Sequence, residues 1–318
     1  MSIRRIPYSD HDEWLQIRRQ YIGGSDAGAV MGMNPYSSPT AVWAEKTGRT
    51  EPFSGNLKTQ LGTEFEAFVA HLFEEQTGKK VRRCNFTLVN DDYPFACANV
   101  DREVIGEDAI LECKFTNSFV NTMKFKENDY PTQWLCQMMH YLAVTGKQKA
   151  YLAVLSECRD FHIFELERDE EDIKTLMDAE KAFWELYVLT GTEPPADDSE
   201  ATARVLSEMY PVDDGTEIMI DLSEDLLARR KVLKDSEKTI RDELTGIDNQ
   251  IKSKIGSASV AVCGPYRITF KDQPTSGIDR KRITEDFPTL DFRQYATHAR
   301  VLRVSAQSAD RRTSSRAS

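Results

Sequence analysis

The sequence predicts a mixed α/β domain in which helices flank a central sheet, followed by a long helix and a small β extension. The first part alternates as helix, strand meander, helix, two strands and helix, an order typical of this fold class. A polar, proline-containing segment, "GTEPPADDSE" (191–200), separates it from one long polar helical pattern. We therefore expect a domain at 1–190, a linker with short elements at 191–221, an extension at 222–304 and a disordered tail at 305–318.

The N-terminal elements are predicted as short helices. One spans residues 12–20, and another spans 38–47, with Pro39 at its first position and Gly48 at its end. Between them, "GGSDAGAVMG" places Ser25 behind two flexible glycines, where it suits the N-cap of a further helix.

The central elements follow the first long helix, whose apolar stripe covers 57–77 and ends at Gly78. The turn signals "NDDYP" and "GED" separate three predicted strands, at 80–89, 95–105 and 109–115. Next come a helix at 131–144, strands at 149–155 and 160–167, and a helix at 169–189.

The extension begins with a helix predicted at 222–255. Its apolar residues follow the spacing of a coiled-coil seam that is weak in its first half: Leu226, Leu233, Ile240, Leu244, Ile247 and Ile251. Two short strands, at 259–263 and 266–270, and a basic segment follow.

The net charge of −11 argues at first against a nucleic-acid partner. However, residues 161–200 contain 13 acidic and 3 basic residues, so almost the whole acidic excess lies in one segment. Basic stretches remain at 79–83, 280–282 and 300–303. The acidic total therefore does not exclude DNA.

The remaining bulk features indicate a cytoplasmic protein that does not enter a membrane. No apolar run approaches the roughly 20 residues that a membrane-spanning helix needs, and the N-terminus lacks the apolar core of a signal peptide. The six cysteines are scattered without a C-x-x-C pair, which is typical of reduced thiols.

One strand, "AILECKF" (109–115), carries two charges in an apolar run. Glu112 and Lys114 are two residues apart, so they point to the same face and need partners if the strand is buried. A hairpin through "VIGEDA" would bring Asp101 beside Glu112. Two adjacent carboxylates raise each other's pKa, and a divalent cation such as Mg²⁺ removes that repulsion. Lys114 would then face the attacking water.

Taken alone, this pattern also fits a surface strand with a Glu–Lys pair beside an unrelated aspartate. Two further features favour a site. Glu66 follows Gly62 by four residues on the long helix, where the missing side chain opens space. Gln133, Gln137 and Tyr141 form a polar row along an apolar helix. His140 on that helix is interpreted as a surface residue.

These motifs carry a resemblance to a known family. The order "IGGSDAGAVMGMNPYSSPTAVWAEKTG", "GTEFE", "VD", "LECKF" and "QMMHY" resembles the YqaJ-like viral recombinase family. Its relatives include phage lambda exonuclease, among the restriction-endonuclease-like nucleases. The resemblance covers about residues 10–190, and it implies a restriction-endonuclease-like fold for this part of the chain.

The resemblance also implies roles for residues at matching positions. Asp101, Glu112 and the Cys113 carbonyl match metal ligands, and Glu66 matches the helix carboxylate that completes a two-metal site. Lys114 matches the catalytic lysine of the E-x-K motif, while Gln137 and Tyr141 match a Q-x-x-x-Y element. Arg18 and Ser25 match the pair that holds a terminal 5′ phosphate. Val100 replaces the proline that often precedes the aspartate.

The implied activity is that of a Mg²⁺-dependent exonuclease, in which Mn²⁺ can substitute. It would digest double-stranded DNA from 5′ ends by a two-metal mechanism, within a phage or prophage recombination system. The resemblance further implies a ring-shaped homo-oligomer and a single-strand annealing protein as partner. Two alternatives are a restriction- or repair-type endonuclease on the same fold and a non-catalytic DNA-binding or scaffold protein.

Overall fold

The computed structural model describes residues 2–51, 55–126, 129–273, 279–287, 301–302 and 304. The chain forms two compact units, Met1–Pro211 and Val212–Ser318. The predicted tail (305–318) and most of the basic segment before it lie outside the described residues.

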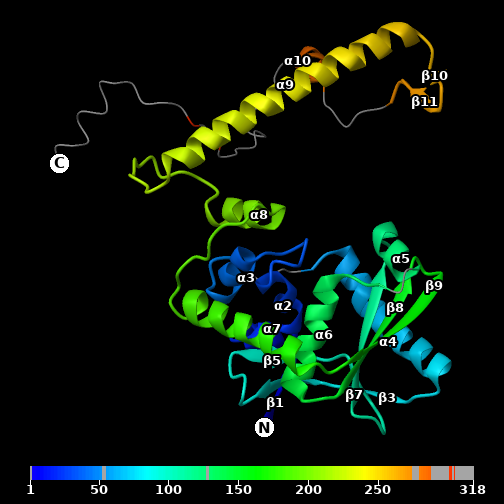
Figure 1. Cartoon of the computed structure of the whole chain (residues 1–318), viewed down its shortest axis with the longest axis vertical. Helices are drawn as coiled ribbons and strands as arrows, with labels where there is room; N and C mark the ends of the chain where they lie inside the picture. Colours follow the sequence, from blue (N-terminus) through cyan, green and yellow to red (C-terminus); the bar gives the residue numbers. More distant parts are fainter. Residues whose placement is uncertain are drawn as a thin grey trace, which may run out of the picture. The chain divides into compact units, whose positions relative to one another are not determined.

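A five-stranded mixed sheet forms the centre of the first unit (Figure 1). Its strand order is β3 (Val81–Arg83), β6 (Arg102–Val104), β7 (Ala109–Thr116), β8 (Lys149–Ser156) and β9 (Asp160–Glu167). β7 and β8 are parallel, whereas the other neighbours are antiparallel. The connection from β7 to β8 contains two helices, α5 (Phe119–Lys126) and α6 (Thr132–Thr145).

The two faces of this sheet are covered by different helices. Leu111 and Cys113 of β7 pack in one cluster with Phe73 of α4 (Leu57–Thr77). Ile110 belongs to the other cluster, which includes Leu142 of α6. Because side chains alternate along a strand, Glu112 and Lys114 share the face of Ile110, toward α6.

A second sheet of four strands carries the N-terminal elements. Its order is β1 (Ile3–Pro7), β4 (Phe86–Asn90), β5 (Ala96–Ala98) and β2 (Ile22–Gly23). Helix α1 (His11–Arg19) connects β1 to β2, and β2 leads directly into α2 (Gly24–Val30). Helix α3 (Pro39–Lys46) begins at Pro39, which is the predicted first position, and Ser38 is its N-cap.

Two glycines allow α2 to approach α6 closely. A Cβ on Gly24 would come within 2.4 Å of the Tyr141 ring, and one on Gly28 would come within 2.8 Å of Gln133 Cβ. Because these contacts leave no room for a side chain, the glycines serve close packing and not chain flexibility. Their contacts fix α2 against the Gln137–Tyr141 face of α6.

The first unit ends with α7 (Glu170–Phe183), the π-helix η1 (Trp184–Val188) and α8 (Glu200–Met209). α8 lies in the segment that the sequence analysis assigned to the linker. It packs against α3, where Thr202 donates a buried hydrogen bond of 2.8 Å to Ser38. This contact places α8 in the first unit, whose boundary falls at Pro211.

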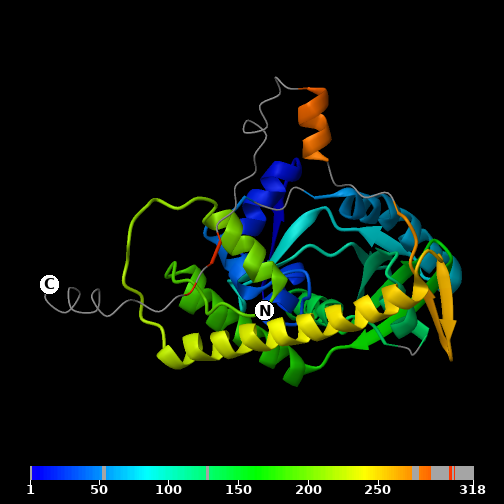
Figure 2. The ribbon, with the colours of Figure 1, turned by 90° about the horizontal axis from the view of Figure 1, so that it is seen from above.

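The second unit begins with α9 (Glu224–Ile255), which forms one continuous helix (Figure 2). Ser223 caps its N-terminus, and Gly256, with φ of 60°, ends it. The antiparallel hairpin of β10 (Val260–Cys263) and β11 (Tyr266–Thr269) follows, and then α10 (Arg280–Asp286). No helix in the described part of the chain is both long and apolar enough to cross a membrane.

Several local predictions were wrong. The strand predicted at 80–89 is divided into β3 and β4, and that at 95–105 into β5 and β6, because the chain passes between the two sheets at both places. Ser25 is not an N-cap: Gly23 occupies that position, so the Ser25 hydroxyl is available to other partners. His140 is fully buried and does not lie on the surface.

His140 forms a buried pair with Glu180 of α7. Its Nε2 donates to the Cys97 carbonyl at 2.8 Å, so Nε2 carries hydrogen, and Nδ1 faces both Glu180 oxygens at 2.8 and 3.0 Å. Burial alone would lower the pKa of His140, but Glu180 raises it above its usual value. The pair therefore holds a proton between α6 and α7.

We expect Glu180→Ala to lower the free energy of unfolding by about 3 kcal/mol, because it leaves His140 buried without its partner. Urea unfolding measures this change. Glu185→Ala, which removes an exposed carboxylate a few residues further on, is the matched control and should alter stability by less than about 0.5 kcal/mol. Equal stability of the two variants would contradict the role of the buried pair.

Candidate active site

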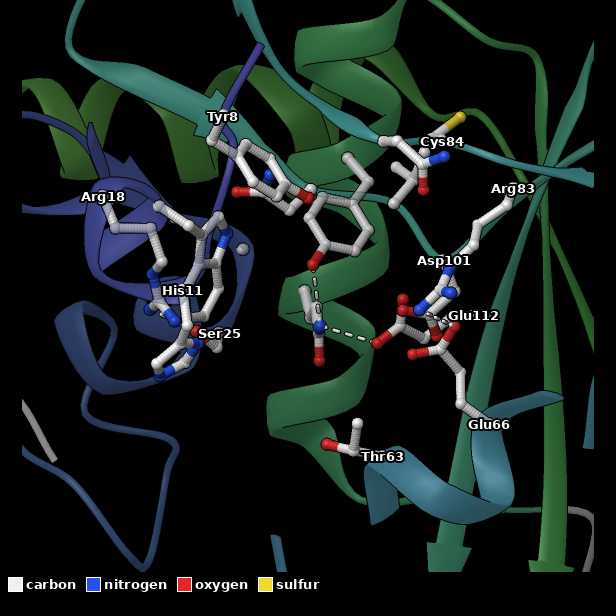
Figure 3. Close-up of a pocket in the computed structure, with 18 of the residues that line it drawn as sticks. Tyr8, His11, Arg18, Ser25, Thr63, Glu66, Arg83, Cys84, Asp101 and Glu112 are labelled. Atoms are coloured by element: carbon white, nitrogen blue, oxygen red, sulfur yellow. Dashed lines mark hydrogen bonds and ion pairs between the residues drawn. The ribbon is translucent and has the colours of Figure 1, made fainter. Parts of the chain in front are cut away.

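An open cavity of about 690 Å³ lies in the first unit, where the chain passes from one sheet to the other. Figure 3 shows Arg18 and Ser25 on one wall, and Glu66, Asp101 and Glu112 on the opposite wall. Gln137 and Tyr141 of α6 also line the cavity. The structure therefore brings the predicted phosphate-binding pair and the three predicted carboxylates into one cavity.

Glu112 and Lys114 form a buried network with α6. Lys114 Nζ donates to Glu112 Oε1 at 2.6 Å and to Gln137 Oε1 at 2.9 Å. The Gln137 amide donates to the same Glu112 oxygen at 2.8 Å and to the Tyr141 hydroxyl at 3.0 Å. One Glu112 oxygen is thus fully engaged, and the network fixes the carboxylate on the α6 side of β7.

Lys114 remains charged in this network. Burial by itself would lower the pKa of its ammonium, but the negative charges of Glu112 and Asp101 outweigh that effect and raise the pKa. In this network Lys114 donates hydrogen bonds and neutralises negative charge on Glu112.

Asp101 lies just before β6, where the pairing of β7 with β6 ends. The β6–β7 ladder pairs Arg102 with Leu111 and Glu103 with Ile110, so the edge beyond Leu111 is open. There, Asp101 Oδ2 accepts the Cys113 N–H at 2.8 Å. Because the N–H and C=O of a strand residue point to the same edge, the Cys113 carbonyl is directed toward Asp101 as well.

The charge of Asp101 is poorly compensated. Burial, together with repulsion from Glu112 and Glu66, raises the pKa of Asp101 well above its usual value. Among the described residues, no Lys or Arg nitrogen lies within 4.0 Å of its carboxylate. The carboxylates of Glu112 and Glu66 each have such a partner.

Glu66 extends from α4 to the same wall of the cavity as Asp101 and Glu112. Arg102 holds it in an ion pair and also donates to the Asp101 carbonyl at 2.7 Å. Arg83 lies 3.9 Å from the same carboxylate. Sequence reasoning missed both arginines, although Arg102 directly follows the aspartate of the "VD" motif.

The donor set fits a divalent cation at Asp101 and Glu112. In the part of the chain that the structure describes, no group of three or more His, Cys, Asp and Glu side chains is placed so that it could hold a metal ion. However, the second oxygen of Glu112 is buried and has no hydrogen-bond partner. This orphaned oxygen and the uncompensated Asp101 carboxylate are hard oxygen ligands of the kind that Mg²⁺ prefers. Glu66 would have to release Arg102 to join them.

The opposite wall contains an arginine aimed at a hydroxyl. Arg18 Nη2 donates to Ser25 Oγ at 2.8 Å and to Asp26 Oδ1 at 3.1 Å. The guanidinium carbon lies 5.0 Å from the centre of the Trp14 ring, and that ring lies against His11 at an interplanar angle of 31°. Neither aromatic residue was predicted, although Trp14 lies one helical turn before Arg18 on the cavity side of α1.

The chain matches known proteins over most of its length. Residues 13–148 match the YqaJ-like viral recombinase domain. The uncharacterized protein YqaJ of Bacillus subtilis is 35% identical over 285 residues, which are 88% of this chain and 89% of that protein. A protein of African swine fever virus is 37% identical over 86 residues, covering 27% of this chain and 23% of the viral protein.

A solved structure shows the same fold. The alkaline exonuclease LHK-Exo of Laribacter hongkongensis superposes with a TM-score of 0.50 and 19% sequence identity, covering 57% of this chain and 95% of the exonuclease. The expected restriction-endonuclease-like architecture, a mixed sheet flanked by helices with a long C-terminal helix, is confirmed. The match to YqaJ along most of both sequences, together with the match to the domain, shows that this chain belongs to the YqaJ-like viral recombinase family.

Proposed function

We propose that the protein is a metal-dependent exonuclease that digests double-stranded DNA from 5′ ends in a phage or prophage recombination system. One observation carries the proposal: the Asp101 carboxylate, which has no ion-pair partner among the described residues, and a buried Glu112 oxygen without a hydrogen-bond partner lie in one cavity with an arginine–serine pair. The fold shared with an alkaline exonuclease supports the same reaction class. We further propose a ring-shaped homo-oligomer in the host cytoplasm and a single-strand annealing protein as partner.

The carboxylates would hold the metal. Asp101 and Glu112 would bind Mg²⁺, or Mn²⁺ in its place, with the Cys113 carbonyl as a further oxygen ligand and Glu66 at a second position. When bound, the cation supplies Lewis-acid activation of water and neutralises charge at the scissile phosphate. The chain's contribution is to hold these oxygens rigidly, since the Cys113 N–H orients Asp101 and the Lys114–Gln137 network orients Glu112.

Lys114 would act on the reacting phosphate as a fixed positive charge. As a cationic donor beside Glu112, it would stabilise the developing negative charge and orient the attacking water by donating a hydrogen bond. Gln137 accepts from the ammonium and donates to Glu112, so it aligns both groups. The Tyr141 hydroxyl accepts a hydrogen bond from the Gln137 amide, and the Tyr141 ring packs against Gly24 of α2.

The opposite wall would recognise the DNA end. A terminal 5′ phosphate carries more negative charge than an internal diester, and Arg18 with the Ser25 hydroxyl provides donors suited to it. A protein that grips this group distinguishes an end from the middle of a duplex. This recognition favours an exonuclease over an endonuclease, and a failure to cut closed circular duplex is the corresponding expectation.

We expect Asp101→Asn and Glu112→Gln each to abolish cleavage while the metal-free protein remains folded. In Asp101→Asn, loss of a charge that Glu112 and Glu66 repel relieves the empty site, so the melting temperature without metal should be unchanged or higher. Glu112→Gln also removes the partner of Lys114, so its melting temperature without metal should be lower. The assay follows linear 5′-phosphorylated duplex with EDTA, Mg²⁺ or Mn²⁺. Asp92→Asn, at an exposed turn, is the matched control. Mg²⁺-dependent cleavage by both site variants would exclude this metal site.

Lys114→Ala should reduce kcat by about a hundredfold, the usual effect of removing one electrostatic catalytic group. Metal binding should persist, because the carboxylates remain, and isothermal titration with Mg²⁺ measures it. Lys147→Ala, which removes another partly buried lysine paired with a carboxylate, should leave kcat unchanged. A large loss of metal affinity with little change in kcat would instead assign Lys114 to metal-site assembly.

Arg18→Ala should slow digestion of 5′-phosphorylated duplex much more than digestion of 5′-hydroxyl duplex, so that the preference between the two ends collapses. Both substrates are compared at one salt concentration, since backbone contacts make DNA affinity salt-dependent. Arg4→Ala, at an exposed pair with Asp91, serves as the control. If Arg18→Ala slows both substrates equally, Arg18 is a general DNA contact and the endonuclease alternative gains support.

A further inference from the structure

We propose that Asp26 and Lys46 are positioning residues that fix the direction of the Arg18 guanidinium, and that they thereby set the preference for a 5′-phosphorylated end. This inference rests on the proposed function, because it concerns how the end-recognising arginine is held. It assigns a role to an ion cluster beneath the cavity wall that neither the metal site nor the catalytic network uses.

Asp26 is fixed from three directions. Its Oδ1 accepts from Arg18 Nη2 at 3.1 Å, while its Oδ2 accepts the Gly23 N–H at 2.9 Å and lies 2.7 Å from Lys46 Nζ. Burial alone would raise the pKa of Asp26, but Lys46 and Arg18 hold it well below its usual range. The aspartate is therefore ionised, immobile and directed at the arginine.

Lys46 connects the cluster to the backbone of the same arginine. Its side chain is fully buried, at 0% exposure, and its Nζ donates to the Arg18 carbonyl at 3.1 Å as well as pairing with Asp26. One ammonium thus fixes the end of α1 and, through Asp26, the guanidinium that extends from it. Apolar side chains could fill this space at lower desolvation cost, but they could not direct a guanidinium.

The charges of the cluster also suit an anionic ligand. Asp26 alone would neutralise Arg18, whereas Lys46 leaves the three groups with one net positive charge. Glu45 lies 3.7 Å from Lys46 with its side chain 28% exposed, so its carboxylate offsets part of this positive charge. The Arg18 guanidinium therefore keeps both its attraction for phosphate and a fixed direction toward Ser25.

The experiment measures the ratio of affinities for 5′-phosphorylated and 5′-hydroxyl duplex by fluorescence anisotropy in EDTA, where no cleavage occurs. The full-length wild-type protein is expected to prefer the phosphorylated end. Asp26→Asn is expected to lower that ratio by at least about tenfold, the size of one hydrogen bond to a charged group. Affinity for the 5′-hydroxyl duplex should change little, because backbone contacts elsewhere remain.

A second variant separates positioning from stability. Asp26→Asn alone leaves Lys46 buried without its carboxylate and lowers the melting temperature. The double variant Asp26→Asn/Lys46→Met removes that orphaned charge, so stability should recover while the affinity ratio stays low. Glu180→Gln is the matched control: it neutralises an equally buried carboxylate in the same unit, and it should lose stability but keep the ratio.

The outcomes distinguish positioning of Arg18 by the Asp26–Lys46 cluster from an effect on stability alone and from a failure of 5′-phosphate recognition. A ratio that returns in the double variant, or that falls equally in Glu180→Gln, means that the cluster acts through stability alone and overturns the inference. A wild-type preference that persists unchanged in Asp26→Asn overturns it while leaving the proposed function intact. A wild-type protein that binds both ends equally overturns the recognition of the 5′ phosphate and this inference together.

Discussion

The candidate site depends on one constraint, the open edge of β7 beyond Leu111. Pairing with β6 stops there, so the Cys113 N–H has no partner in the sheet and bonds to Asp101 instead. That single contact places an aspartate beside the Glu112 face of the same strand. If the β6–β7 ladder continued for two more residues along β7, a backbone carbonyl would accept the Cys113 N–H, and Asp101 would lose this hydrogen bond. The incomplete ladder therefore creates the acidic edge.

A second contact relates that edge to the opposite wall. Gly24 allows α2 to press against the Tyr141 ring, and Tyr141 ends the hydrogen-bonded row that begins at Lys114. Any side chain at position 24 would displace the helix that carries Ser25 from the helix that carries Gln137. The distance between the arginine–serine pair and the acidic edge is thus set by packing between two helices and not by a loop. Such a rigid spacing suits the proposed cleavage at a fixed distance from an end.

The sequence predicted those features that are encoded locally. The bounds of α4 at residues 57 and 77 are as predicted, since a continuous apolar stripe and Gly78 define them. The buried charges of "AILECKF" correctly indicated a pair and a nearby carboxylate. Three of the missed features depend on distant partners: Arg102 with Glu66, His140 with Glu180, and α8 with α3. Nothing near His140 in the sequence reveals that α7 will cover it, so its helix face could not be read as buried.

The distribution of counter-charges around the cavity reconciles an acidic protein with a polyanionic substrate. Glu66 is paired with Arg102, Glu112 with Lys114, and Asp26 with Arg18 and Lys46. Unlike these three carboxylates, Asp101 has no Lys or Arg partner among the described residues. A bare carboxylate would repel a phosphate, and the proposed cation at this position would remove that repulsion. Because the negative excess of the chain is concentrated between residues 161 and 200, the net charge of −11 says little about the field inside the cavity.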